Sequence, residues 1–343
     1  MPSDMFISNA QNREDVVLWR ALSSVADGRY VEVGANDPVD DSITRAFYDH
    51  GWSGLEVEPE PDFARRFRES RPRDVVVEAA VTPHGDSIVL HRIAGTGLST
   101  TVDGISAGHE ESGFSTEDLT VRGARLDALL AETGFDRGDV HFCVIDVEGA
   151  EADVLSTVDL RAWRPWVLVI EATEPNSTRS TRDQWEAGVL AAGYQFCLFD
   201  GVSCFYVADE HAATLAARLS YAAAVTDHYV DARHERTVAD LSERLQQALV
   251  DLADSEAQTQ EWRTKALVTW ASGIVSSTDL AARSGQVDFL TAQLAKAEKR
   301  NARQATQIRE LRQRLRQTPV VSEPGSSAGL GAKVARTISR RGR

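Results

Sequence analysis

The sequence predicts an α/β domain with a doubly wound, mostly parallel sheet, followed by a helical, coiled-coil-like C-terminal arm. Three observations support this prediction. Short apolar stretches alternate with helical patterns over the first two thirds of the chain, which is typical of strands joined by crossover helices. One of these stretches ends in Gly34, two residues after Glu32, and another ends in Glu58, directly before Pro59. After residue 209, long runs rich in Ala, Leu, Gln and Arg replace the alternation.

Eight stretches are expected to be strands because they are short, apolar and bounded by turn residues. They are residues 30–34, 53–58, 74–78, 87–93, 140–146, 166–171, 194–199 and 203–207. Asp200-Gly201 separates the last two and predicts a hairpin, and therefore an antiparallel strand that closes the sheet at its edge. The apolar residues of 95–120 show no regular spacing. This segment is expected to form either a loop over the active site or an ordinary surface loop.

The first strand carries the most informative motif, Tyr30-Val31-Glu32-Val33-Gly34-Ala35-Asn36-Asp37-Pro38. An apolar strand that ends in glycine and a polar turn is how a doubly wound domain presents a cofactor. Gly34 would let the backbone approach the ligand, and Glu32, Asn36 and Asp37 would supply polar groups. Only one of the three glycines of the dinucleotide fingerprint is present, which favours a cofactor without a pyrophosphate. A buried strand that ends in a tight turn is the alternative reading.

Glu58 ends the second strand, 24 residues after Gly34. A carboxylate at about this distance from the first glycine is placed to accept hydrogen bonds from ribose hydroxyls. The strand, the spacing and the helix expected over residues 41–50 all agree with this role. A solvated loop carboxylate is the alternative.

Five motifs in this order resemble the FkbM family of S-adenosylmethionine-dependent O-methyltransferases, over about residues 6–207. The motifs are Gln11-Asn12-Arg13-Glu14-Asp15, Val31-Glu32-Val33-Gly34-Ala35, Glu56-Val57-Glu58-Pro59, Arg125-Leu126-Asp127 and Ile145-Asp146-Val147-Glu148-Gly149-Ala150-Glu151. The resemblance implies a class I methyltransferase (Rossmann-like) fold with S-adenosylmethionine as cofactor. It also implies methylation of a hydroxyl on a sugar, a glycan or glycolipid, or a secondary metabolite, without identifying the acceptor.

Three acidic residues near later strand ends are candidates for the chemistry. An acceptor hydroxyl hardly ionises at neutral pH, so a base or a metal should assist its deprotonation. Asp146 is expected to be the base or a ligand of Mg²⁺, which prefers oxygen donors. Glu148 would orient the acceptor or the methionine part of the cofactor, and Glu171 would be a second acid at the pocket floor. The alternative for Glu148 is that it starts a helix.

Two other functions remain open. An NAD-dependent sugar-modifying enzyme is disfavoured by the glycines missing after Gly34. A catalytically silent adaptor that organises glycan-assembly enzymes would use the long arm, but would not need Glu32, Glu58, Asp146 and Glu148. His50, His84 and His91 are rival bases, although none stands in a recognisable pattern with an orienting group.

The charge is distributed unevenly along the chain. The net charge is −15, yet residues 296–343 hold 13 Lys and Arg against three Asp and Glu. The acidic remainder would repel nucleic-acid phosphates. Three cysteines are too few for a disulfide framework, and Cys143 is expected to be a buried core residue. No signal peptide or membrane span is recognisable, which predicts a cytoplasmic protein.

The C-terminal third is expected to be an arm over residues 210–317, after a catalytic domain over residues 1–209. Apolar residues three and four apart predict two helices able to pair as a coiled coil, with a break near 272–285. Asn301 and Gln304 occupy core positions, where polar residues can fix register and oligomeric state. The arm would make the protein a homo-oligomer or dock it to a partner; packing on its own domain is the alternative. Residues 318–343 read as a linker and a basic tail, which would either contact an anionic membrane weakly or act as a solubilising extension.

Overall fold

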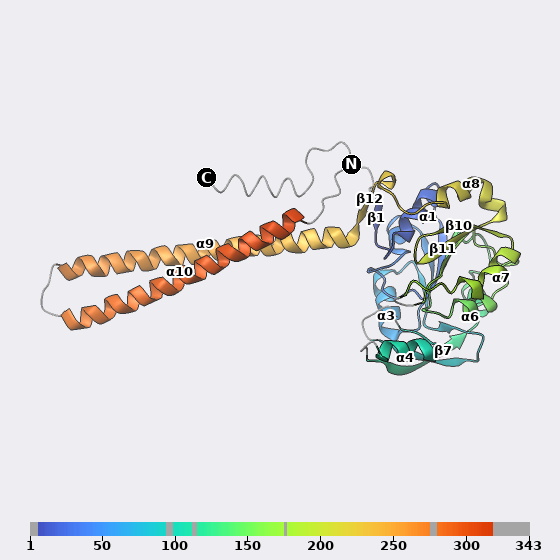
Figure 1. The fold of residues 1–343 in the computed structure, drawn as a ribbon, viewed down its shortest axis with the longest axis horizontal. Helices are drawn as coiled ribbons and strands as arrows, with labels where there is room; N and C mark the ends of the chain where they lie inside the picture. Colours follow the sequence, from blue (N-terminus) through green and yellow to red (C-terminus); the bar gives the residue numbers. More distant parts are fainter. Residues whose placement is uncertain (1–5, 94–98, 112–114, 175–176, 275–279, 318–343) are drawn as a thin grey trace. The chain divides into compact units, whose positions relative to one another are not determined.

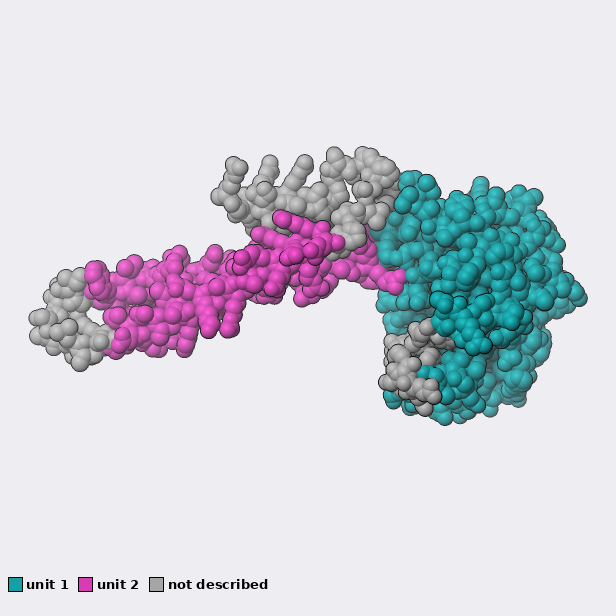
Figure 2. Space-filling model, viewed as in Figure 1, with its two compact units in different colours: residues 1–231 teal, residues 232–343 magenta. Residues whose placement is uncertain are grey.

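The computed structural model describes residues 6–93, 99–111, 115–174, 177–274 and 280–317. The chain divides into two compact units, residues 1–231 and residues 232–343 (Figures 1 and 2). The first unit extends past the expected boundary at residue 209. Its last elements are helix α8 (Asp209–Leu219), the 3-10 turn η2 (Val225–Asp227) and strand β12 (Tyr229–Asp231). Strand β12 pairs in parallel with β1 (Phe6–Ser8), which fixes this end of the unit to its beginning.

A seven-stranded sheet forms the centre of the first unit, in the order β10-β11-β9-β8-β2-β3-β4. The strands are β2 (Arg29–Val33), β3 (Ser53–Val57), β4 (Val75–Val77), β8 (Phe142–Ile145), β9 (Val167–Glu171), β10 (Tyr194–Phe199) and β11 (Ser203–Ala208). Pairs among β4, β3, β2, β8 and β9 are parallel. Strand β11 is antiparallel to both of its neighbours, β9 and β10.

The position of the antiparallel strand differs from the expectation. The hairpin at Asp200-Gly201 exists, and its strands β10 and β11 pair in antiparallel fashion. The antiparallel strand β11 does not close the edge, however, because it lies between β9 and β10. The edge is formed by β10, whose exposed Phe196 and Phe199 fit a strand with one free side.

Helices cover both faces of the main sheet (Figure 1). Residues of α1 (Glu14–Leu22), α2 (Arg45–Asp49) and α8 pack with Tyr30 and Phe142 on one face. Residues of α5 (Leu126–Thr133), α6 (Glu151–Ser156) and α7 (Glu186–Ala191) pack with Val31 and Cys143 on the other. Helix α3 (Pro61–Ser70) follows β3, and the 3-10 turn η1 (Arg182–Gln184) precedes α7. The unit is therefore a three-layer α/β structure.

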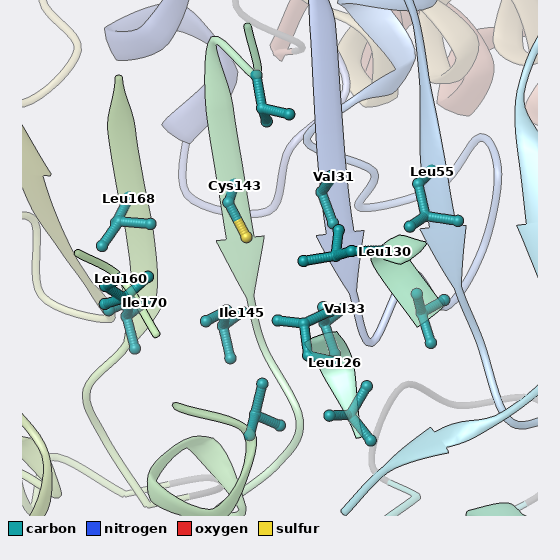
Figure 3. Close-up of a cluster of buried hydrophobic side chains, with 14 of the residues drawn as sticks. Val31, Val33, Leu55, Leu126, Leu130, Cys143, Ile145, Leu160, Leu168 and Ile170 are labelled. Atoms are coloured by element: carbon teal, nitrogen blue, oxygen red, sulfur yellow. The ribbon is translucent and has the colours of Figure 1, made fainter. Parts of the chain in front are cut away.

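Apolar side chains from adjacent strands align in rows across the sheet. Leu168, Cys143, Val31 and Leu55 are register partners on four neighbouring strands and are all completely buried. Figure 3 shows this row, with Leu126 and Leu130 of α5 over the strands. The prediction that Cys143 is a core residue is confirmed.

A second, three-stranded sheet lies between β4 and β8 in the chain. Its order is β5-β7-β6, with β5 (Ala80–Val81), β6 (Ser87–Arg92) and β7 (Glu117–Ala124). The strand expected over 87–93 therefore exists, but outside the main sheet. Part of the segment expected to be a loop forms helix α4 (Asp103–Glu111) and β7, while residues 94–98 and 112–114 lie outside the described residues.

The second unit contains two long helices, α9 (Ala232–Ile274) and α10 (Leu280–Gln317). Leu241, Leu245 and Ala248 of α9 are buried with Ile308 and Leu311 of α10. Farther along, Asn301 donates a hydrogen bond to Thr259 (Nδ2 to Oγ1, 3.0 Å), and Arg263 pairs with Glu298. The partner numbers fall on one helix as they rise on the other, so the helices are antiparallel. The predicted seam is thus buried within a single chain.

The expected basic tail, residues 318–343, lies outside the described residues. In the part of the chain that the structure describes, no helix combines the length and the apolar character needed to cross a membrane.

Candidate active site

A pocket lies where β2, β3, β4 and β8 end. Carboxyl ends of neighbouring parallel strands meet at one edge of a sheet, which is where this class of fold binds ligands. The pocket is lined by Val33, Gly34, Asn36, Val57, Glu58, Pro59, Glu60, Phe63, Ala79, Ala80, Val81, Leu90, Ser99, Thr101, Asp146, Val147, Glu148 and Ala150. Five residues predicted from the sequence are therefore brought together: Gly34, Asn36, Glu58, Asp146 and Glu148.

Gly34 is required by the local backbone as well as by the pocket. Its φ of 86° lies in the left-handed region, and a Cβ atom there would come within 1.7 Å of the backbone oxygen of Asp146. Its N–H donates to Val57 O at 2.9 Å. The glycine thus lets the loops after β2 and β8 approach each other, a close contact that any side chain would prevent.

Glu58 is held rigidly at the end of β3. One carboxylate oxygen accepts a hydrogen bond from the Asn36 N–H and the other from the Glu60 N–H, both at 2.7 Å. The residue is only 5% exposed, and this burial raises its pKa to about 8. When it is ionised, a carboxyl group has about four acceptor sites, so Glu58 then retains capacity for two further donors.

The turn after β2 contributes Asn36 but not Asp37. Asn36 has a φ of 53°, and its buried side-chain oxygen has no hydrogen-bond partner among the described residues. Asp37 instead accepts bonds from the N–H groups of Val39 and Asp40 and pairs with Arg66 at 2.5 Å. Asp37 therefore shapes the turn, and it is not among the residues that line the pocket.

Glu32 also lies away from the pocket lining, in a buried polar network. Its carboxylate accepts a bond from Thr44 Oγ1 at 2.7 Å, and the same hydroxyl bonds Glu56 at 2.9 Å. Arg71, which is fully buried, pairs with Glu56 at 2.9 Å and donates to Pro38 O and Ser42 Oγ. The network thus anchors the 38–44 loop, and burial raises the pKa of Glu32 to about 7.

Four acids cluster where β8 and β9 end. A hydrogen bond joins the side chains of Asp146 and Glu171. Burial, followed by the charges of Asp146, Glu148 and Glu151, raises the pKa of Glu171 to about 12. Burial and the same Asp146 and Glu151 charges raise the pKa of Glu148 to about 9. At neutral pH Glu171 therefore carries a proton and donates it in the bond to Asp146.

The turn that carries Glu148 is fixed from both sides. Glu148 and Gly149 have φ values of 52° and 97°. Glu151 Oε1 accepts bonds from the N–H groups of Gly149 (3.0 Å) and Val147 (3.3 Å) at the start of α6. Thr100 Oγ1 donates to Glu148 O at 2.9 Å from the excursion between β6 and α4. Glu151 is thus the helix-starting acid, whereas Glu148 is left facing the pocket.

The histidines considered as bases do not line the pocket. His91 Nδ1 lies 2.7 Å from Asp118 Oδ1, and His91 Nε2 lies 2.9 Å from Asp103 Oδ1. These contacts connect β6 to β7 and α4. His84 is largely exposed near Asp153. His50 bonds the Ala46 carbonyl.

Several pocket residues were not predicted from the sequence. Ser99 and Thr101 come from the excursion, whose lack of period gave no reason to single them out. Ala79, Ala80 and Val81 form an apolar wall after β4. Glu60 directly follows the recognised Glu58-Pro59 pair, and this position in the sequence could have identified it as a pocket residue.

The expected Mg²⁺ site is not supported by the side-chain arrangement. Among the residues that the structure describes, no group of three or more His, Cys, Asp or Glu side chains is placed to hold a metal ion. Asp146 and Glu171 are bonded to each other through the proton on Glu171. No step of the reaction is therefore assigned to a metal.

Comparison with known proteins supports a methyltransferase domain in this chain. Residues 32–196 match the family model described as "Methyltransferase FkbM domain". The resemblance found in the motifs is therefore confirmed over residues 32–196. One similar solved structure is a TehB-like SAM-dependent methyltransferase from Corynebacterium glutamicum, at 9% identity and a TM-score of 0.32; the match covers 57% of this chain and 86% of that one. No curated protein matches the chain.

Proposed function

We propose that the protein is an S-adenosylmethionine-dependent O-methyltransferase that acts on a hydroxyl of a sugar, a glycan or glycolipid, or a secondary metabolite. The observation that carries the proposal is the pocket of the FkbM domain. There Glu58 and the Asp146–Glu148 turn converge from neighbouring strand ends.

The strand order supports a class I methyltransferase (Rossmann-like) fold. Five parallel strands reverse their order at β2 and β8, which creates a crevice at the carboxyl ends of these two strands. The pocket lies at this switch point, with Gly34 and Asp146 on its two sides.

The residues present fit S-adenosylmethionine. Glu58 has spare acceptor sites for ribose hydroxyls, and its backbone-bonded position is set before a ligand arrives. The buried side-chain oxygens Asn36 Oδ1 and Glu148 Oε2 lack partners among the described residues. Asn36 can accept a bond from a ligand's ammonium or hydroxyl group, and the protonated Glu148 can bond a ligand oxygen. Of the described residues that line the pocket, none is basic, which suits a cofactor without phosphates.

When bound, the cofactor would supply an electrophilic methyl group. The chain would position the acceptor and remove its proton. Asp146 is the proposed base, because Glu171 keeps its own proton and holds the Asp146 carboxylate by a hydrogen bond. Glu148, whose pKa of about 9 keeps it protonated at neutral pH, would donate to an acceptor oxygen. Positioning of this kind can supply much of the rate of an in-line displacement.

The charge of the pocket limits the acceptor. The proposed base Asp146 carries its negative charge beside the reacting hydroxyl, and none of the described lining residues is basic. A phosphate or carboxylate near the reacting hydroxyl would therefore be repelled. A neutral, hydroxyl-rich acceptor is favoured.

Label transfer tests this function. The protein would be incubated with methyl-tritiated S-adenosylmethionine and a panel of neutral glycans and polyols, with an NADH-dependent reduction assay in parallel. We expect tritium in an ether-linked methyl group of the product. Hydride transfer from NADH without methyl transfer would reject the proposal.

For the arm, we propose a role in oligomerisation or docking. Support comes from apolar side chains outside its seam: Leu267, Val268, Trp270 and Phe289 are each more than half exposed. Sedimentation of the full-length protein at micromolar concentration tests oligomerisation. A monomer would reject it.

A further inference from the structure

Glu60 is a buried acid in the pocket to which no role has yet been assigned. It directly follows Pro59 and is the residue that precedes the first turn of α3. It is 2% exposed and lines the pocket. Glutamate is almost never buried to this degree unless its carboxylate has partners.

One of its two carboxylate oxygens is held by Arg92 of β6. Arg92 Nε donates to Glu60 Oε1 at 2.9 Å, and Arg92 Nη2 lies 2.8 Å from the same oxygen. The Glu60 N–H donates to Glu58, so the two glutamates are fixed relative to each other. Both the position and the rotation of the Glu60 carboxylate are therefore determined before a ligand binds.

The second oxygen, Oε2, is buried and has no hydrogen-bond partner among the described residues. A buried acceptor without a donor is costly, so such a group in a native pocket calls for an explanation. A donor brought in by a ligand would satisfy it.

Much of the pocket lining is apolar. Val57, Phe63, Ala80, Val81 and Leu90 line the same pocket as Glu60. Apolar walls with a few placed polar groups are typical of sites for flat aromatic ligands. If Glu58 binds the ribose, the base attached to that ribose must lie close by, and adenine carries an exocyclic amine that donates hydrogen bonds.

We propose that Glu60, oriented by Arg92, recognises the exocyclic amine of the cofactor's adenine and makes the pocket selective for adenine over hypoxanthine. This inference rests on the proposed cofactor. Hypoxanthine carries an oxygen in place of the amine, and that oxygen would face the Glu60 carboxylate as one acceptor against another. A site built around such a bond rejects the analogue that lacks the donor.

Calorimetric titration of two probes tests the proposal without requiring turnover. The probes are S-adenosylhomocysteine and its hypoxanthine counterpart, S-inosylhomocysteine. The wild type should bind the adenine compound about 10- to 100-fold more tightly. In Glu60→Gln, Arg92 should hold the amide oxygen, so the amide nitrogen would face the base. The preference should then disappear or reverse.

Asp62→Asn is the matched control. Asp62 also binds Arg92, at 3.0 Å, but it is half-exposed and does not line the pocket. Its substitution should leave the preference for adenine unchanged.

The outcomes separate this inference from the proposed function. A wild type that binds both compounds equally overturns the role of Glu60 while the cofactor assignment stands, and this holds even if Glu60→Gln does not fold. A folded Glu60→Gln that keeps the wild-type preference also overturns it. A wild type that binds neither compound overturns the proposed function and the inference together.

Discussion

The proton on Glu171 gives the sharpest prediction about the acidic cluster. Glu171 is 7% exposed, and its pKa of about 12 lies far above the ordinary value of 4.5. Between these two pH values the folded protein holds a proton that the unfolded chain has released. The free energy of unfolding should therefore fall as pH rises, by about 1.4 kcal/mol per pH unit for this one group.

Glu171→Gln removes this contribution while keeping a donor for Asp146. The mutant should gain stability relative to the wild type as pH rises, by about 3 kcal/mol between pH 6 and pH 8. Urea unfolding of both proteins at several pH values measures this difference. A difference that stays constant over this range would show that Glu171 is not the proton carrier.

Glu171→Leu is the companion variant, because it removes the titratable group and the donor together. Glu171→Gln should keep most of the turnover, since its amide can donate to Asp146. Glu171→Leu should lose on the order of tenfold or more, the value of a hydrogen bond to a charged group. Equal turnover in the two variants would contradict the orienting role of Glu171.

Three further predictions concern the base, the buried network and the domain boundary. Asp146→Asn should abolish turnover while changing the affinity for S-adenosylhomocysteine much less, and excess EDTA should leave wild-type turnover unchanged. Arg71→Met should lower the free energy of unfolding by about 3–5 kcal/mol, because it leaves the buried Glu56 carboxylate without its charged partner. Arg45→Met, which breaks the more exposed pair with Asp49, should lower it by less than about 1 kcal/mol. A fragment of residues 1–231 should unfold cooperatively, whereas one ending at residue 210 should not, because it lacks the core residues Leu215 and Leu219.

The sequence was sufficient to predict where the pocket would lie. Apolar stretches ending in Gly34, Glu58 and Asp146 are local features, and carboxyl ends of neighbouring parallel strands necessarily meet at one edge. The prediction of which acids face that edge was less complete. Strand β2 is buried on both faces, so its pattern does not show that Glu32 points towards Thr44 and away from the pocket.

Features that depend on distant parts of the chain could not be predicted from local patterns. Strand β11 lies between β9 and β10 because of tertiary pairing, while the hairpin signal specifies only that β10 and β11 are neighbours. The bond between Glu60 and Arg92 joins residues 32 positions apart on different elements. The two helices of the arm were predicted from the spacing of their apolar residues, but not that they pair within one chain.

The most direct test of the central claim is the binding of S-adenosylhomocysteine to the wild type and to Glu58→Ala, measured by calorimetry. The wild type should bind the compound. The variant should lose about 1.5–3 kcal/mol of binding free energy, roughly 10- to 150-fold in affinity, because its ribose acceptor is gone. A folded Glu58→Ala protein with wild-type affinity would contradict the assignment of this pocket to the cofactor.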